Sequence, residues 1–351
     1  MGKFYSCLVL AVLLASSFVA DAKILRVGYN GAALAGVDYS SIDNANNAAN
    51  AGDTIQIYGY QGGSISKQLV VQGFGYNFDV HPGLQVIGTD APSDGYIYFQ
   101  AGSENSILEG CNMDAYIYTS NITVRRCFGN VTLYNDQRVI NNVKVISSVI
   151  TGGGMAYNGY NPVTNFQAYN CILQYGIGFY LPESSGAFVN CVSGSPNIYG
   201  ASPLSLNNAA FLVKNCILGY HNTGNINTVY DNNYFMQAAP NPLPQGSNNR
   251  WGVSFSDLFK RLDGTSDNPS WYGYGEFDEN YFLLSATSPA LNGGFDGSNN
   301  PTDCGIFGGE AAYRYKISGV PPVPAVYKLT APGSSASSNP YNITISVRSN
   351  N

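Results

Sequence analysis

The chain has 351 residues, a net charge of -6 and only 11% charged side chains. Because its 16 Lys and Arg residues form no run longer than Arg125-Arg126, neither a nucleic-acid backbone nor an anionic membrane surface is expected as a partner. The 40 glycines and 27 tyrosines, together with many Asn and Ser residues, are typical of an all-β chain with many tight corners.

Residues 1–22 have the layout of a signal peptide. Lys3 precedes an apolar run, and Ala20-Asp21-Ala22 supplies small residues for cleavage. We therefore expect an exported protein whose mature chain begins at Lys23. Its expected location is the cell surface or the extracellular space, with the periplasm as the alternative. No other segment is apolar enough to span a bilayer, so no transmembrane segment is expected.

Cysteine recurs after short apolar runs through the middle of the chain. Six segments can be aligned on this position, and successive segments are about 21 residues apart, with some variation. This is the pattern of a solenoid with insertions in its loops. The short strands predict a β-solenoid. Leucine-rich repeats have a similar period, but the Leu columns that they need are missing. The aligned positions are Cys111, Cys127, Ser148, Cys171, Cys191 and Cys216.

Stacked coils bring these positions into one column at a spacing of about 4.8 Å. We expect a ladder of buried thiols with Ser148 as an isosteric break, because stacked cysteines direct their Cβ atoms unfavourably for disulfides. Disulfides or a metal site are the alternatives. Asn170, Asn190 and Asn215 precede three of the cysteines. Asn tolerates positive φ, so these residues suit a sharp bend, with side-chain amides expected to bond to one another along the stack.

The segment "YSSIDNANNAANAGDTIQIYGYQGGSI", residues 39–65, resembles the start of pectin-lyase-like proteins, the right-handed parallel β-helix superfamily. Residues 69–77 resemble the next coil, and residues 286–309 resemble the closing segment of secreted bacterial members. The resemblance implies a single-stranded right-handed parallel β-helix with an N-terminal capping helix, a C-terminal closing segment and a short β tail. It specifies no reaction, because the superfamily includes lyases, hydrolases, adhesins and proteins without known activity.

On the basis of this resemblance, we divide the chain into three parts. The signal peptide is followed by a β-helix domain at residues 23–318, which contains a non-repeating insertion at about 236–285. Residues 319–351 form a Pro-rich linker and a C-terminal β tail, because "YNITISVR" alternates as a hairpin strand does. A sorting tail is the alternative reading of this last segment.

Candidate catalytic residues are few. A β-helix lyase needs carboxylates that hold Ca²⁺ and a basic side chain that removes a proton, and a hydrolase needs clustered carboxylates. Arg125 and Arg126 begin a charged cluster that extends to Lys144, and either contact a uronate or are solvated beside a turn. The remaining catalytic candidates are Glu276 and Asp278. His81 and His221 are separated by most of the coils, so no shared histidine site is expected.

Two aromatic groups are candidates for stacking against sugars. The first lies in "WYGYGEFDEN", where aromatic side chains stand beside carboxylates; a packed loop with an acidic rim is the competing interpretation. The second is a strip of tyrosines along the solenoid axis. The competing interpretation is that tyrosine is simply common on exposed strands. The first group comprises Trp271, Tyr272, Tyr274 and Glu279, and the second comprises Tyr116, Tyr118, Tyr134, Tyr157 and Tyr160.

Together these features predict an exported, non-catalytic β-helix protein at the cell surface or outside the cell. We expect it to contact glycans or other surfaces, with a polysaccharide or cell-surface glycan as partner. The alternative is a polysaccharide lyase or glycoside hydrolase that acts on an acidic polysaccharide. No cofactor or metal is expected, except for Ca²⁺ under the lyase alternative.

Overall fold

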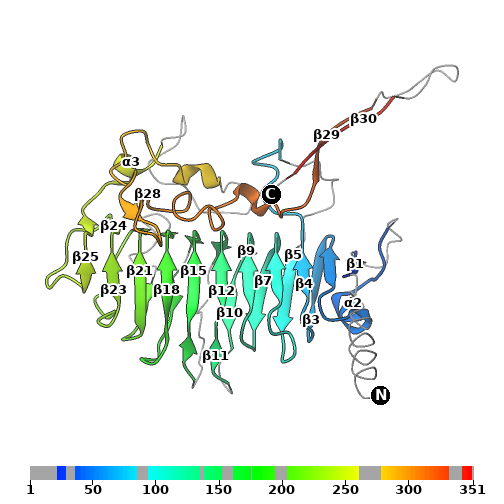
Figure 1. The fold of residues 1–351 in the computed structure, drawn as a ribbon, viewed down its shortest axis with the longest axis horizontal. Helices are drawn as coiled ribbons and strands as arrows, with labels where there is room; N and C mark the ends of the chain where they lie inside the picture. Colours follow the sequence, from blue (N-terminus) through cyan, green and yellow to red (C-terminus); the bar gives the residue numbers. More distant parts are fainter. Residues whose placement is uncertain are drawn as a thin grey trace, which may run out of the picture.

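The computed structural model describes residues 22–28, 36–84, 94–134, 138–151, 161–174, 176–193, 204–260, 278–331 and 342–349. Within them the chain forms a parallel β-helix, in which successive coils each add a strand to two long parallel sheets (Figure 1). The solenoid predicted from the cysteine period is therefore confirmed. No helix within these ranges combines the length and the apolar character that a membrane crossing requires.

Sheet A and sheet B each contain 11 strands. Sheet A consists, in spatial order, of β1 (Ile24–Val27), β2 (Thr54–Ile57), β4 (Val70–Gln72), β6 (Ile107–Glu109), β8 (Thr123–Arg125), β12 (Lys144–Ile146), β15 (Phe166–Tyr169), β18 (Ser185–Val189), β21 (Ala210–Lys214), β23 (Val229–Asp231) and β25 (Gly246–Ser247). Sheet B consists of β3 (Tyr60–Ile65), β5 (Asp94–Phe99), β7 (Asn112–Ile117), β9 (Phe128–Gly129), β13 (Val149–Ile150), β16 (Ile172–Leu173), β19 (Val192–Ser193), β22 (Ile217–Leu218), β24 (Tyr234–Phe235) and β26 (Arg250–Trp251), with β10 (Val131–Leu133) paired to β7.

Shorter elements complete the coils and the ends of the chain. Two parallel pairs, β11 (Ile140–Asn141) with β14 (Val163–Thr164) and β17 (Ile177–Gly178) with β20 (Leu204–Ser205), lie outside the two long sheets. Beyond the last coil follow α3 (Phe255–Leu258), η1 (Glu279–Phe282), the antiparallel pair β27 (Gly294–Phe295) and β28 (Pro301–Thr302), η2 (Ile317–Gly319), and the antiparallel pair β29 (Ala325–Thr330) and β30 (Thr344–Arg348).

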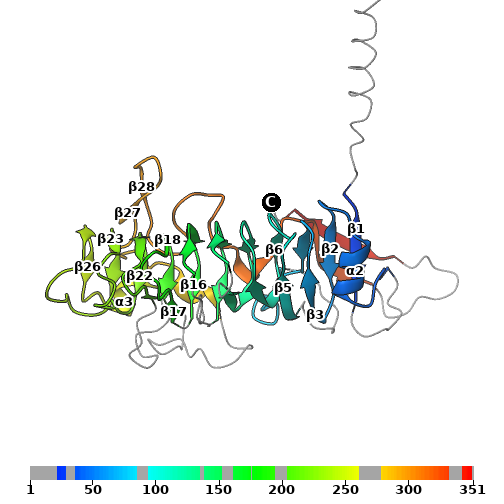
Figure 2. The ribbon, with the colours of Figure 1, turned by 90° about the horizontal axis from the view of Figure 1, so that it is seen from below.

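Helix α2 (Ile42–Ala48) covers the first coils (Figure 2). Ser41 begins the helix because its hydroxyl accepts a hydrogen bond from the backbone N–H of Asn44 at 3.2 Å. Ile42 and Ala45 are buried against the first coils. The helix thus covers apolar surface at a solenoid end, where an open sheet edge would invite aggregation.

Each coil bends from sheet A to sheet B at a residue with positive φ. Asn170, Asn190 and Asn215 have φ of 52°, 55° and 56°, and form one column of such bends. In all but the last of these coils, the next residue points inward and is buried. The bend column contains Gly110, Arg126, Ser147, Asn170, Asn190, Asn215, Asn232 and Asn248. The inward column includes Cys111, Cys127, Ser148, Cys171, Cys191, Cys216 and Asn233, and all its cysteines are unpaired.

The repeat extends further than the sequence analysis expected. β25 and β26 pair with β23 and β24 in the same two sheets, so another coil runs through Trp251. The non-repeating segment therefore begins after Trp251 and not at residue 236. The cysteine pattern misses the last coils because Asn-Asn pairs, at Asn232-Asn233 and Asn248-Asn249, replace Asn-Cys while keeping a residue that accepts positive φ at the bend.

Residues 294–321, here called the return segment, run back along the bend column in the direction opposite to the coils (Figure 1). The asparagine amides bind this segment in addition to forming the expected contact along the stack. Within the described part of the bend column, one amide pair is joined directly, Asn215 to Asn190 at 3.4 Å. The amides donate from Asn170 to Ile306 O (2.7 Å) and Gly308 O (2.9 Å), from Asn190 to Asp303 O (2.9 Å) and Gly305 O (3.2 Å), and from Asn215 to Phe295 O (2.8 Å).

The return segment also covers an apolar column on the outer face of sheet B. Phe128, Val149, Ile172, Val192, Ile217 and Tyr234 follow one another in register and are buried in a second core, which includes Ile306 and Tyr315. In the preceding coils the same column holds Tyr60, Asp94 and Asn112. These three side chains are polar or partly polar and are not buried. The covered core therefore gives way to an open polar face at β7.

Candidate functional site

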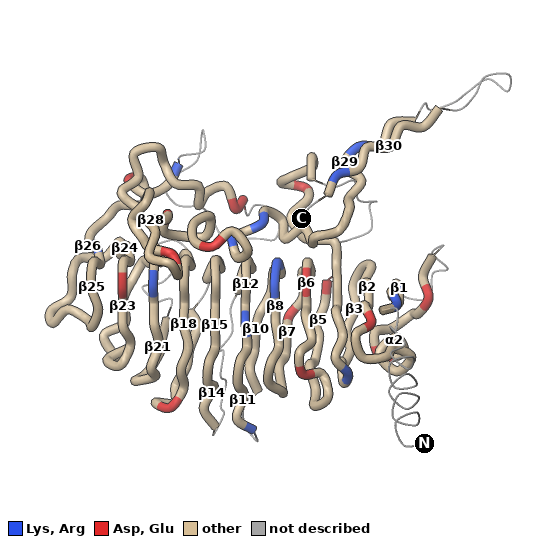
Figure 3. The backbone as a smooth tube through the Cα atoms, in the orientation of Figure 1, with Lys and Arg blue, Asp and Glu red and all other residues tan. Residues whose placement is uncertain are grey.

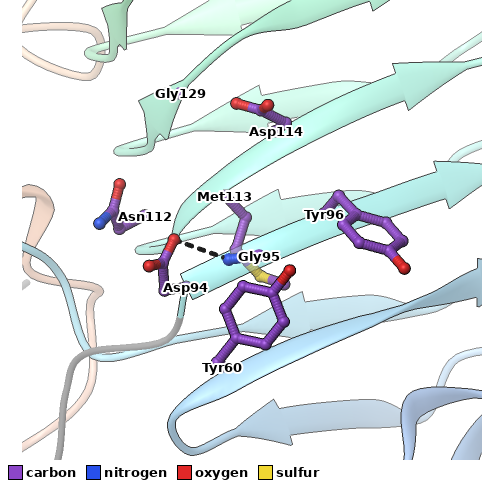
Figure 4. Close-up of a pocket in the computed structure, with 8 residues that line it drawn as sticks. All are labelled: Tyr60, Asp94, Gly95, Tyr96, Asn112, Met113, Asp114 and Gly129. Carbon is purple, nitrogen blue, oxygen red and sulfur yellow. Dashed lines mark hydrogen bonds between the residues drawn. The ribbon is translucent and has the colours of Figure 1, made fainter.

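The open end of this column forms a shallow pocket on the outer face of sheet B (Figure 4). It encloses about 170 Å³ and is built by strands β3, β5, β7 and β9. Two carboxylates and two tyrosine rings contribute to its lining, and no basic side chain does. The lining residues are Tyr60, Asp94, Gly95, Tyr96, Asn112, Met113, Asp114 and Gly129.

Hydrogen bonds and a glycine fix the polar groups of this pocket. Asp114 accepts from the backbone N–H of Asn130 at 2.8 Å and from its side-chain amide at 3.2 Å. Asp94 accepts from the backbone N–H of Gly95 at 2.8 Å (Figure 4). Tyr96 lies against Gly62, where an added Cβ would come within 2.4 Å of the tyrosine ring. Only glycine at this position lets the ring of Tyr96 lie close to the sheet.

A strip of tyrosines continues from the pocket across the sheet, and includes the predicted Tyr116, Tyr118 and Tyr134. The rings of Tyr98 and Tyr116 stack with centroids 5.0 Å apart, and those of Tyr118 and Tyr134 with centroids 4.5 Å apart. These separations are close to the distance between neighbouring strands. Tyr96 contacts Tyr98 edge-on at 5.3 Å and joins the strip to the pocket. Tyr157 and Tyr160 lie outside the described residues.

The strip and pocket form one surface of aromatic faces beside polar groups. Burial and the negative charge of Asp114 raise the pKa of Tyr116, so its hydroxyl stays protonated at neutral pH. The chain carries few charges along its strands (Figure 3). In each stacked pair the partner covers one face of each ring, so the surface offers the remaining ring faces and edges to the apolar faces of sugars. Its carboxylate and amide groups are available to the hydroxyls of the sugar.

The predicted arginines Arg125 and Arg126 are already bound within the protein. Arg125 pairs with the buried Glu109, with Nε to Oε1 at 2.8 Å and Nη2 to Oε2 at 2.9 Å. Arg126 donates to the backbone carbonyl of Val320 at 3.1 Å, which ties it to the return segment. Neither arginine forms an ion pair with Asp278 among the described residues, and Glu276, the fourth catalytic candidate, lies outside them.

The predicted group around residue 275 is only partly described. Trp271, Tyr272, Tyr274 and Glu276 lie outside the described residues. Asp278 and Glu279 begin η1, and Glu279 is fully buried, bound to His81 at 2.8 Å. Because its side chain is fully buried, Glu279 is not exposed to a glycan as the predicted ligand-binding residue would be. These two residues belong instead to a separate cluster.

Sequence reasoning missed Tyr60, Asp94 and Asn112 because a long insertion separates β4 from β5 and interrupts the repeat. One signal was available: "YIYF" in β5 and "AYIY" around the end of β7 both alternate tyrosine with buried apolar residues. No protein-family model matches the chain, and no curated protein is significantly similar to it.

Proposed function

We propose that the protein is an exported β-helix of the pectin-lyase-like type that binds glycans without chemical turnover, through the tyrosine strip and its adjoining pocket. The observation that carries the proposal is the stacking of Tyr98 on Tyr116 and of Tyr118 on Tyr134, next to an open polar pocket. Export is supported by the signal-peptide pattern of residues 1–22.

The charge of the surface favours a neutral glycan over an acidic one. Asp94 and Asp114 face the pocket, and no lining residue is Lys, Arg or His. A uronate would meet like charges with no cation to offset them. A neutral sugar would instead donate its hydroxyls to the carboxylates, and charge-assisted hydrogen bonds are stronger than neutral ones.

The second candidate function is glycoside hydrolysis, because Asp94 and Asp114 come from adjacent strands and line the same pocket. Inverting and retaining hydrolases both use a pair of carboxyl groups. Against this function, Asp114 already accepts two hydrogen bonds from Asn130, which is the arrangement of a structural carboxylate. We therefore rank binding first.

The proposal is tested on the mature protein with a panel of immobilised neutral and acidic polysaccharides. The double variant Tyr98→Ala/Tyr116→Ala is expected to lose at least about fivefold in affinity for the retained glycan, since a stacked aromatic contact contributes about 1 kcal/mol. Tyr180→Ala is the matched control, because Tyr180 is an exposed tyrosine outside the strip. If both variants lost the same affinity for the glycan, the tyrosine strip would not be part of the binding site.

Turnover is followed in the same samples by reducing ends and by absorbance of unsaturated products. We expect none. Release of reducing ends that disappears in Asp94→Asn and persists in Tyr180→Ala would overturn the non-catalytic proposal in favour of hydrolysis. Unsaturated products would indicate a lyase and would direct attention to another part of the surface.

A further inference from the structure

A second polar cluster joins two segments that are far apart in the sequence. His81 lies in the loop that follows β4, and Asp278 and Glu279 lie at the start of η1, close to 200 residues later. His81 Nε2 is 2.8 Å from Glu279 Oε2 and 3.5 Å from Asp278 Oδ1. One donor atom from each of the three residues lies within 4.8 Å of the other two.

The carboxylate of Glu279 is held rigidly in the interior. Its side chain is 0% exposed, compared with 11% for His81 and 24% for Asp278. Glu279 Oε1 accepts from the backbone N–H of Ser318 at 3.0 Å and from the hydroxyl of Tyr315 at 3.4 Å. Glu279 Oε2 is thereby directed toward His81, and the cluster opens toward solvent on the side of Asp278.

The charges of this cluster do not balance within the protein. Among the described residues, His81 is the one basic side chain that pairs with either carboxylate. Even a protonated His81 leaves one net negative charge. A divalent cation would balance the charges of both carboxylates and would stabilise this arrangement.

One buried hydroxyl beside the same carboxylate lacks a hydrogen-bond partner within the described part of the chain. The hydroxyl of Ser318 is buried and has no hydrogen-bond partner among the described residues, although the backbone N–H of Ser318 donates to Glu279. Tyr76 and Tyr315 share a hydrogen bond of 2.7 Å between their hydroxyls, and burial raises the pKa of both well above its usual value. The neutral tyrosines supply no positive charge to Glu279.

We propose that His81, Asp278 and Glu279 bind a divalent transition-metal ion of the zinc class. An imidazole nitrogen with two carboxylate oxygens is a donor set that such ions accept, whereas Ca²⁺ and Mg²⁺ prefer oxygen ligands alone. Zinc–ligand bonds are about 2.0–2.1 Å long, so the ligand atoms of a tetrahedral zinc site are about 3.3 Å apart. The separations of 2.8 and 3.5 Å bracket this value.

The ion would have a structural role, independent of glycan binding. It would connect the loop after β4, near the first coils, to the segment that leads into the return segment. Three protein ligands leave a position for water. The backbone N–H of Tyr76 already donates to Ser318 O at 2.8 Å, so the ion would reinforce an existing contact between the loop after β4 and the return segment.

The test uses the mature protein freed of metal with EDTA and then titrated with Zn²⁺, with Ca²⁺ as the comparison. We expect one bound Zn²⁺ per chain by elemental analysis and calorimetry, and a rise in Tm of at least about 3 °C that Ca²⁺ does not produce. Less than about 0.1 Zn²⁺ per chain at saturating concentration, with Tm unchanged, would overturn the proposal.

Two variants separate this site from binding elsewhere. Asp278→Asn keeps the size of a partly exposed side chain and is expected to weaken Zn²⁺ binding at least tenfold, as is His81→Gln. The control Asp296→Asn alters an exposed carboxylate in the return segment and is expected to leave the affinity for Zn²⁺ unchanged. Full-affinity binding by a folded Asp278→Asn protein would assign the ion to another location and overturn the proposal.

Discussion

At the scale of single residues, the bend asparagines combine two requirements in one side chain. Asn190 has a positive φ of 55°, a conformation that most L-residues avoid. Its amide also donates to the carbonyls of Asp303 and Gly305. Glycine would meet the first requirement alone, and glutamine the second alone. The repeated choice of Asn follows from the need for both.

Replacement of this residue should separate the two contributions. We expect Asn190→Ala to lower the free energy of unfolding by about 3 kcal/mol, since it adds about 1 kcal/mol of backbone strain to the loss of two buried hydrogen bonds. Asn190→Gly should cost about 2 kcal/mol, because glycine accepts the backbone conformation. Equilibrium unfolding in urea measures both values.

The matched control is Asn299→Ala, which changes an exposed Asn with a φ of 63° in the turn between β27 and β28. It should cost only the strain, about 1 kcal/mol. If Asn190→Ala were no more destabilising than this control, the hydrogen bonds to the return segment would contribute nothing to stability.

Some residue contacts were accessible from the sequence and others were not. Arg125 and Glu109 are 16 residues apart, the same separation as Cys127 and Cys111, so the repeat places them side by side. The contact between His81 and Glu279 joins an insertion to a non-repeating segment 198 residues away. No period relates these two segments, and only the path of the folded chain brings them together.

At the scale of elements, the two C-terminal parts differ in how they are attached. The return segment is bound by the bend asparagines and buries Ile306 and Tyr315. The hairpin of β29 and β30 instead projects away from the solenoid and contacts it at its base, where Arg348 donates to Leu84 O (Figure 1). Its residues Leu329, Ile345 and Val347 are exposed. The β tail was foreseeable from its alternation, but its separation from the body was not, because alternation does not identify a packing partner.

Truncation should expose this difference. Ending the chain at Ala325 removes the exposed part of the hairpin, so we expect Tm to change by less than about 2 °C, the effect of less than about 1 kcal/mol in a chain of this size. Ending it at Pro289 also removes the return segment and uncovers the second core, so soluble folded protein should be lost. A fall of more than about 5 °C for the Ala325 truncation would show that the hairpin supports the solenoid. Differential scanning calorimetry provides the values.

At the scale of the whole molecule, the return segment should make the coils open together. A solenoid held only by neighbour contacts frays from its ends, because each coil interacts with the next alone. Here the return segment contacts coils from Asn215 to Arg126. The fold class was predictable from the repeat, since a column of like residues implies stacking. The long-range connection made by the return segment could not be predicted, because this segment has no repeat of its own.

Thiol labelling measures this cooperativity. In the native mature protein we expect iodoacetamide to modify Cys111, Cys171 and Cys216 slowly and at one common rate, because all three are fully buried. Burial, the main cause, raises the pKa of Cys304 to about 12, so this thiol is also unreactive until the return segment detaches. Mass spectrometry of the labelled peptides gives the rate at each site. Labelling of Cys216 about tenfold faster than Cys111 would indicate fraying from the C-terminal end.

The return segment also constrains how the protein can vary in size. An ordinary solenoid can gain or lose one coil, because the neighbouring coils close against each other across the change. In this chain an extra coil between Asn170 and Asn190 would move the two amides one strand spacing further apart, about 4.8 Å. Their carbonyl partners on the return segment would stay where they are. The number of coils is therefore matched to the length of residues 294–321, and duplication of a coil succeeds only with a compensating insertion there.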